Sequence, residues 1–229
     1  MLLHMYIVRH GQTYFNRYNR LQGWSNSPLT EAGIRDARKA GDRLKNIGFT
    51  AAFCSDTTRA QQTVQAILDA NTCWASSTGP RPFISDAAFR EQFYGYFEGH
   101  DMGEAWWAAG APHGAPGYAS IVEKYGLAAT RDFLKEADPF HDAESDAEYW
   151  ARIDSGFALI ARTAEEWGLP DGSPVLQISH GNTLLSMMSR FAPEGYDLTR
   201  RPANGSITRF DFDTGKTLDS AISVAGYNE

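Results

Sequence analysis

In MYIVRHGQTYFN, residues 5–16, four apolar residues run directly into Arg9, His10 and Gly11. The apolar run predicts a buried strand over residues 4–9. Two side chains that can both be positive repel each other unless an anion lies between or beside them. We therefore expect an anion to bind where this strand ends.

Two later stretches have the same order of features. Ser55 and Arg59 follow a short apolar run at 51–55, and His180 and Asn182 follow another at 174–179. In open α/β sheets, ligands bind where the carboxyl ends of strands meet helix N-termini, whose free N–H groups favour phosphate. Two arginines and two histidines at one sheet edge indicate a pocket for a phosphoryl group.

The remaining pattern alternates helices with strands. Thr30 is a candidate N-cap for the first long helix. Helices are predicted over residues 31–46, 57–70, 147–168 and 180–191, and further strands over 82–85, 206–213 and 216–224. This alternation predicts an α/β fold: a three-layer α/β/α sandwich with a mostly parallel central sheet flanked by helices.

Residues 101–146 differ in composition, being rich in Gly, Ala, Pro and Trp and then acidic. We expect a single domain over 1–229, with residues 101–146 inserted as a helical cap subdomain over the active site and forming most of the pocket wall. Its aromatic residues need a core to pack against. They are Trp106, Trp107, Tyr118, Tyr125 and Phe133.

Bulk properties exclude several classes of protein. A net charge of −7 and a pI near 5.4 argue against nucleic acid or an anionic membrane as the main partner. Cys54 and Cys73 are too few for a disulfide scaffold. No signal peptide is apparent and no apolar run approaches the ~18 residues of a membrane helix, so we expect a cytoplasmic protein. The apolar content of 101–140 leaves a homodimer open.

Five motifs occur along the chain in this order: RHGQT, Asn16, CSDTTRAQQT, FREQFYGYFEG and SHGN. Together they resemble the histidine phosphatase superfamily, which has the phosphoglycerate-mutase-like fold. The sequence FYGYFEG is more similar to the phosphatase branch of this superfamily than to the mutases. The resemblance covers about 1–100 and 147–213, and the insertion matches nothing diagnostic.

The resemblance implies a role for each matching residue. His10 would be the nucleophile, with its other ring nitrogen held by a backbone carbonyl at Gly11 or nearby. Arg9 and Arg59 would hold phosphoryl oxygens. His180 would donate to the same oxygens, as a protonated or partner-stabilised ring. No metal or other cofactor is implied, since arginines and histidines supply the positive charge.

Glu91 matches the family's proton donor, although Glu98 in the same motif is an alternative acid or a structural carboxylate. Ser55 is interpreted mainly as a cap of the turn after its strand. Further candidates for binding substrate or phosphate are Asn16, Gln22, Gly23, Gly181 and Asn182.

Three functions follow from this resemblance. A phosphatase would pass the phosphoryl group from His10 to water, whereas a phosphoglycerate mutase would pass it to a second substrate hydroxyl and needs more basic groups. Residues 104–150 hold three basic residues against nine acidic ones, which favours a phosphatase acting on a small, less anionic phosphorylated metabolite. A catalytically inactive binding module is the third, although it would be expected to lack His10, Glu91 or His180.

Overall fold

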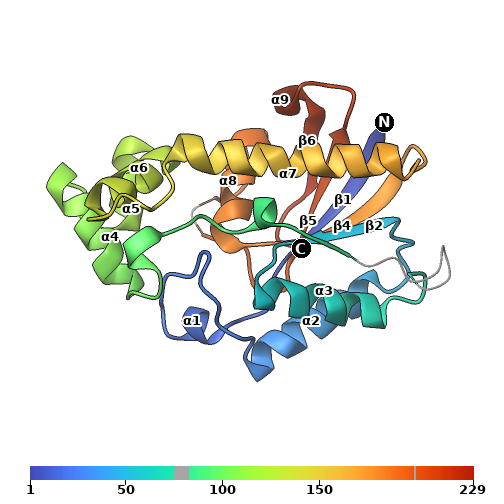
Figure 1. The fold of residues 1–229 in the computed structure, drawn as a ribbon, viewed down its shortest axis with the longest axis horizontal. Coiled ribbons are helices and arrows are strands. Elements are labelled where there is room, and N and C mark those ends of the chain that lie inside the picture. Colours follow the sequence, from blue (N-terminus) through green and yellow to red (C-terminus); the bar gives the residue numbers. More distant parts are fainter. Residues whose placement is uncertain (75–82, 199) are drawn as a thin grey trace.

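The computed structural model describes residues 1–74, 83–198 and 200–229. Within these ranges the strands form a single sheet (Figure 1). They are β1 (Leu2–Arg9), β2 (Ala51–Cys54), β3 (Ile84–Ser85), β4 (Ser173–Ser179), β5 (Ile207–Asp213) and β6 (Ile222–Gly226). Their order in the described sheet is β3-β2-β4-β1-β5-β6. The pairs from β3 to β1 are parallel, while β5 and β6 are antiparallel to their neighbours, so the mostly parallel sheet is confirmed.

Helices cover both faces of this sheet (Figure 1). The α-helices of the described residues are α1 (Tyr14–Arg17), α2 (Glu31–Leu44), α3 (Thr58–Ala70), α4 (Met102–Gly110), α5 (Tyr118–Tyr125), α6 (Leu127–Ala137), α7 (Asp146–Glu166), α8 (Gly181–Phe191) and α9 (Leu218–Ala221). α2 and α3 pack on one face, and α7 and α8 pack on the other. The three-layer α/β/α arrangement is therefore confirmed.

The alternation of side chains along the central strands explains the two layers of core. On β4, Val175 packs with α7 and α8, whereas Leu176 and Ile178 pack with α2 and α3. On β1, Met5 and Val8 divide in the same way. Successive side chains of a strand point to opposite faces, so a strand that is apolar on both faces has to lie between two layers. This position holds the carboxyl ends of β1 and β4 side by side.

Most predicted bounds agree with the structure to within two residues. Thr30 accepts a hydrogen bond from the Gly33 N–H at 3.1 Å, which confirms it as the N-cap of α2. The strand predicted over 216–224 is wrong in its first half, because Leu218–Ala221 form α9 and the strand begins at Ile222. The Ser220 N–H donates to the Thr217 carbonyl, which closes a turn where an extended chain was expected. Of the strand predicted over 82–85, Ile84–Ser85 are extended and Pro82 lies outside the described residues.

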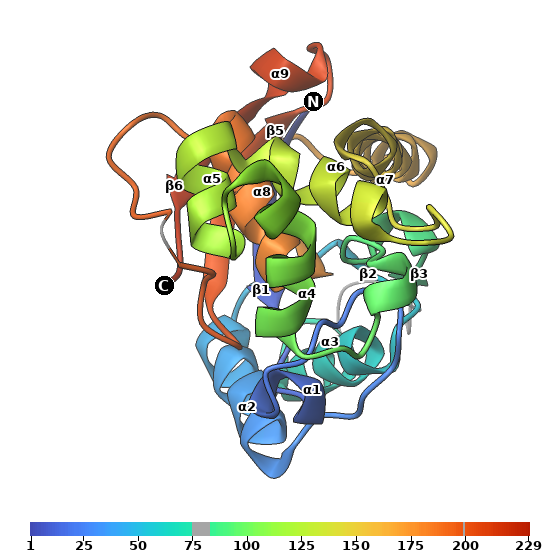
Figure 2. The same cartoon turned by 90° about the vertical axis from the view of Figure 1, so that its left-hand side faces the viewer.

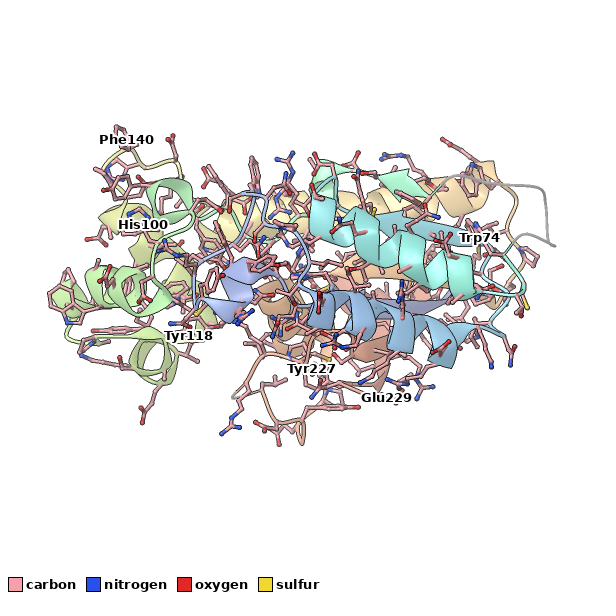
Figure 3. All side chains as sticks on the ribbon, turned by 90° about the horizontal axis from the view of Figure 1, so that it is seen from below. Trp74, His100, Tyr118, Phe140, Tyr227 and Glu229 are labelled. Carbon is pink, nitrogen blue, oxygen red and sulfur yellow. The ribbon has the colours of Figure 1, made fainter. Side chains whose placement is uncertain are left out.

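Helices α4, α5 and α6, which we call the cap, lie together in front of the carboxyl ends of the central strands (Figure 2). Their shared core includes Trp106, Ile121 and Leu134. Trp107 was expected in this core but is 63% exposed. Figure 3 labels His100 and Tyr118 at the cap end of the molecule and Trp74 at the opposite end. Across the part of the chain that the structure describes, no helix has the length and apolar character needed to cross a membrane.

Candidate active site

A cavity lies between the carboxyl ends of the central strands and the cap. Its lining comes from the end of β1 and the segment after it, the segment that precedes the cap, the first residues of α4 and α8, and the loop before β5. The residues are Arg9, His10, Asn16, Arg20, Leu21, Gln22, Glu91, Tyr94, Met102, Gly181 and Arg201. Glu91 is the one carboxylate among these described lining residues, and it shares the cavity with three arginines. The cavity is therefore rich in positive charge although the chain as a whole is acidic.

His10 follows the last residue of β1 and is almost fully buried. Its Nδ1 lies 2.8 Å from the Gly11 carbonyl oxygen, so Nδ1 carries the proton and Nε2 keeps a lone pair. The predicted backbone partner at Gly11 is thereby confirmed. Burial, followed by the charges of Arg59 and Arg9, holds the pKa of His10 well below its ordinary value. A neutral imidazole with a free lone pair is the form that can act as a nucleophile.

Arg9 ends β1 beside His10. It donates to the Pro202 carbonyl through Nη1, while its buried Nε has no hydrogen-bond partner among the described residues. Burial, together with the nearby positive charge of Arg201, lowers the pKa of Arg9 to about 10, so it stays charged at neutral pH. Its charge has no carboxylate partner within 4 Å in the described chain. The guanidinium is therefore available to an anion.

Arg59 and His180 form a pair beneath His10. Arg59, fully buried on α3, donates through Nη2 to the Gly23 carbonyl at 2.7 Å and contacts His180 Nδ1 at 3.2 Å. The other His180 nitrogen, Nε2, lies 3.1 Å from Ser55 Oγ. Burial and the charge of Arg59 lower the pKa of His180, so its neutral ring accepts from Arg59 and donates to Ser55. Both ring nitrogens of His180 therefore face protein groups, and neither His180 nor Arg59 is among the described lining residues of the cavity, so the predicted donation to phosphoryl oxygens stays a prediction. The ring centroid of His180 is 5.2 Å from that of His10.

The two candidate acids of FREQFYGYFEG have different surroundings. Glu91 faces the cavity, and its carboxylate accepts from the Asn182 N–H at 2.8 Å and the Thr183 hydroxyl at 2.7 Å. Glu98 accepts from the backbone N–H groups of residues 23, 24 and 25 and of Tyr94. It therefore holds the loop whose carbonyls bind Arg59, and it does not line the cavity. This geometry favours Glu91 as the proton donor and a structural role for Glu98.

The other candidates divide between the cavity wall and its support. Asn16, Gln22 and Gly181 line the cavity. Gly23 instead supports Arg59, and a Cβ atom there would lie 1.9 Å from the Gln92 carbonyl oxygen, so only glycine fits. Asn182 supports the acid through its N–H and donates through Nδ2 to the Tyr94 hydroxyl at 2.6 Å.

The sequence analysis did not identify five of the lining residues: the apolar Leu21 and Met102, and the polar Arg20, Tyr94 and Arg201. Tyr94 lies three residues after Glu91 in a motif that was already singled out, so its position was a usable signal. Burial raises the pKa of Tyr94, which keeps its phenol protonated and able to donate into the cavity. Arg20 and Arg201 lie in loops with no pattern that would point to a site.

The cap contributes less to the cavity than the sequence predicted. Met102, the first residue of α4, is the one residue of the expected insertion among the described lining residues. Two of the three basic residues of 104–150 form ion pairs with carboxylates: Arg131 with Asp146 at 2.5 Å and Lys135 with Glu148 at 2.7 Å. These two basic residues therefore stabilise the packing of the insertion and of the start of α7. The net charge of the insertion does not indicate the charge of the cavity lining. Among the described residues, no group of three or more His, Cys, Asp or Glu side chains is placed to hold a metal ion.

Residues 5–221 match the model of the histidine phosphatase superfamily (branch 1). The chain is 30% identical over 229 residues to a protein of Enterobacter sp. (strain 638) named "Probable phosphoglycerate mutase GpmB", with 98% of this chain and 93% of that protein covered. It is 32% identical over 234 residues to the protein of the same name from Yersinia pestis (strain Pestoides F), with the same shares covered.

Solved structures show the same fold. A phosphoglycerate mutase from Bacillus anthracis str. Sterne superimposes with a TM-score of 0.84 at 27% identity, covering 100% of this chain and 93% of that chain. A mycobacterial glucosyl-3-phosphoglycerate phosphatase superimposes with a TM-score of 0.67 at 20% identity, covering 100% and 99%. The similar proteins thus carry the names of both mutases and phosphatases.

Proposed function

The chain belongs to the histidine phosphatase superfamily, and on that premise we propose that it hydrolyses a small phosphate monoester through a phosphohistidine on His10. The observation that carries the proposal is the state of the His10 ring. The Gly11 carbonyl fixes its proton on Nδ1, and burial between two arginines keeps it neutral. A buried neutral imidazole beside fixed positive charge suits attack on a phosphoryl group, because the arginines stabilise the charge of the transition state.

In the first step, the Nε2 lone pair of His10 attacks phosphorus and the bond to the ester oxygen breaks. The departing electron pair stays on that oxygen, and Glu91, in its acid form, gives it a proton. Arg9 and Arg59 balance the charge on the phosphoryl oxygens. Glu91 is well placed for this proton transfer because the first turn of α8 holds its carboxylate at the cavity wall.

In the second step, Glu91 takes a proton from water, and the water oxygen attacks phosphorus. The phosphorus–nitrogen bond breaks, its electron pair returns to Nε2, and inorganic phosphate leaves. One carboxylate thus serves first as acid and then as base, and the enzyme returns to its starting state.

Phosphoglycerate mutase is the second candidate function, because relatives carry that name and because Arg20 and Arg201 line the cavity. A mutase must hold a doubly phosphorylated intermediate and therefore needs additional cations. We favour hydrolysis because the cap supplies no cation among the described lining residues. The two reactions share the phosphohistidine and differ in the acceptor of the phosphoryl group.

The first test is turnover of p-nitrophenyl phosphate by the wild type, by His10→Ala and by the matched control His113→Gln, which changes a histidine of the cap. We expect at least a thousandfold loss for His10→Ala, since removal of a nucleophile has effects of about that size or larger, and near wild-type rates for His113→Gln. Equal turnover by all three proteins, or none with any monoester, would contradict the proposal.

Two further measurements separate the roles. Glu91→Gln should lose more activity with glycerol 3-phosphate than with p-nitrophenyl phosphate, because a good leaving group needs no proton. Equal losses would assign the proton to another group. With 3-phosphoglycerate and a bisphosphoglycerate primer, we expect release of phosphate; rapid isomerisation without release would establish the mutase instead.

A further inference from the structure

The segment that carries Glu91 is irregular in the described structure. Residues 90–94 connect two short 3₁₀ turns, Ala87–Phe89 and Gly95–Phe97, and belong to no strand of the described sheet. The backbone groups of such a segment have no helix or sheet partners, so other groups have to satisfy them. For the carbonyls around Glu91, most of these partners come from one arginine of α7.

Arg152 lies in the second turn of α7 and binds the main chain of the acid and of the residues before it. Its Nη1 donates to the carbonyls of Ala88 at 3.1 Å and Arg90 at 2.8 Å. Its Nη2 donates to the Glu91 carbonyl at 3.2 Å, and the Trp24 indole donates to the same oxygen at 3.1 Å. One guanidinium group therefore holds three carbonyls of this segment.

Glu144, two residues before α7, holds the same segment from the other side. Its carboxylate accepts from Arg152 through both oxygens, from Nε at 2.6 Å and from Nη2 at 2.8 Å. The same carboxylate accepts from the Phe93 N–H at 2.9 Å, and the Glu144 N–H donates to the Phe93 carbonyl at 3.0 Å. Both side chains of the pair are mostly buried. Because a bidentate pair has a fixed geometry, residues 88–93 are held as one unit.

Arg152 itself does not reach the substrate. It is not among the described lining residues of the cavity, and each of its three guanidinium nitrogens has a protein acceptor. Arg190 of α8 offers a comparison, because it also pairs with a carboxylate of α7. Its ion-pair partners are Asp154 and Asp219, both of which lie outside residues 88–93.

We propose that Arg152, paired with Glu144, is a positioning residue for Glu91 in its role as acid and base. The first turn of α8 holds the carboxylate of Glu91, and Arg152 holds its main chain. Displacing a reacting group by about 1 Å can cost about 10²-fold in rate, so both ends of the residue have to be fixed. This inference rests on the proposed phosphoryl transfer, and it connects the end of the insertion to the proton transfer.

The test uses the leaving group of the substrate, because a good leaving group needs no proton from Glu91. Arg152→Gln should lower kcat/KM for glycerol 3-phosphate by about 10- to 100-fold and that for p-nitrophenyl phosphate by less than about threefold. Arg190→Gln is the matched control: it breaks ion pairs of α7 and should leave the ratio of the two values unchanged. Equal losses on the two esters in Arg152→Gln, or the same change of ratio in Arg190→Gln, overturn the proposal.

A double variant shows whether Arg152 acts through Glu91. Adding Arg152→Gln to Glu91→Gln should cause little further loss with glycerol 3-phosphate, because the proton donor is already absent. Losses that multiply overturn the proposal.

If Arg152→Gln does not fold, Trp24→Phe takes its place. This variant keeps a ring that can stack on Phe93 and removes one donor to the Glu91 carbonyl. The ratio of the two kcat/KM values should shift in the same direction by a smaller factor, and an unchanged ratio overturns the proposal.

The single variant Glu91→Gln separates this failure from that of the proposed function. If its loss is larger with glycerol 3-phosphate but that of Arg152→Gln is not, the positioning role alone is wrong. If Glu91→Gln loses equally on both esters, the role of Glu91 and its positioning are overturned together. If the wild type hydrolyses neither ester, the proposed function is overturned as well.

Discussion

Arg59 and Arg131 are both fully buried arginines, one beneath the cavity and the other where the cap meets α7 and α8. Arg131 pairs with Asp146, donates to the Ser186 hydroxyl, and stacks 3.9 Å from the Tyr149 ring centroid. Arg59 contacts two backbone carbonyls and the neutral ring of His180, with no carboxylate within 4 Å in the described chain.

This difference separates structural charge from functional charge. A buried cation that pairs with a carboxylate holds two parts of the protein together. A buried cation without such a partner costs stability, because it loses its hydration without gaining an opposite charge. The same burial lowers the pKa of Arg59 to about 10. Arg59 beneath the cavity and Arg9 in its wall both lack a carboxylate partner within 4 Å among the described residues, so neither charge is neutralised by the protein.

The largest expected effect is on catalysis. Arg59→Gln should reduce kcat/KM for p-nitrophenyl phosphate by about 10²- to 10³-fold, the usual cost of losing one donor to a developing oxyanion. Its thermal midpoint should change less than that of Arg131→Gln, because removal of a buried charge without a carboxylate partner offsets the donor that the Gly23 and Ser25 carbonyls lose. Less than a tenfold loss of activity would show that Arg59 is structural after all.

Arg131→Gln should have the opposite pattern. We expect the free energy of unfolding to fall by about 1.5–3 kcal/mol, the range for hydrogen bonds to charged groups, since Asp146 and Ser186 lose their donor. Below the unfolding transition, kcat/KM should remain within threefold of the wild type. Denaturant unfolding measures the loss of stability, and steady-state kinetics on the same preparation measure the activity. A loss of kcat without a loss of stability would contradict the assignment of Arg131 as structural.

The pH dependence of folding stability should originate from the two buried histidines, His10 and His180. The pKa values of His10 and His180 are lowered in the folded protein, whereas the unfolded chain has the ordinary value of 6.5. Below pH 6.5 the unfolded state therefore binds more protons, and stability falls by up to about 1.4 kcal/mol per histidine per pH unit. Thermal midpoints measured from pH 7.5 to 5 should decrease, and the slope should be shallower in His10→Gln. A flat profile in the wild type would rule out neutral buried rings.

The smallest effect should come from the outer ion pair of the cap region. Lys135 and Glu148 are partly exposed, so Lys135→Gln should cost only about 0.2–1 kcal/mol. The cost should shrink further at 1 M salt, because screening weakens exposed pairs. A loss comparable to that of Arg131→Gln would mean that exposure does not distinguish the two pairs.

Local patterns were sufficient to predict the sheet and the centre of the site. Apolar runs that end in Arg9–His10 and in His180 placed these residues at strand ends, and the topology brings those ends together. Trp107 shows the limit of composition: neighbours on a helix point about 100° apart, and the core-facing side of α4 is formed by Ala105, Trp106 and Ala109, which leaves Trp107 exposed. The extended pattern at 216–224 failed because a local turn at Thr217 competes with strand pairing.

Arg201 marks a deeper limit. It reaches the cavity only because an irregular loop returns to the N-terminus of α8, and nothing in the residues around it encodes that distance. The charge count of 104–150 gives no information about the cavity lining for a related reason. It recorded how many charges the insertion holds, but Arg131 and Lys135 are committed to Asp146 and Glu148.

The position of β1 also determines when a newly made chain can complete the candidate site. β1 pairs with β4 and β5, whose residues 173–179 and 207–213 are synthesised long after His10. His180, Arg201 and the strands that flank the nucleophile all arrive in the last quarter of the chain. A chain interrupted before residue 173 therefore carries His10 without the strand and the side chains that surround it in the folded protein.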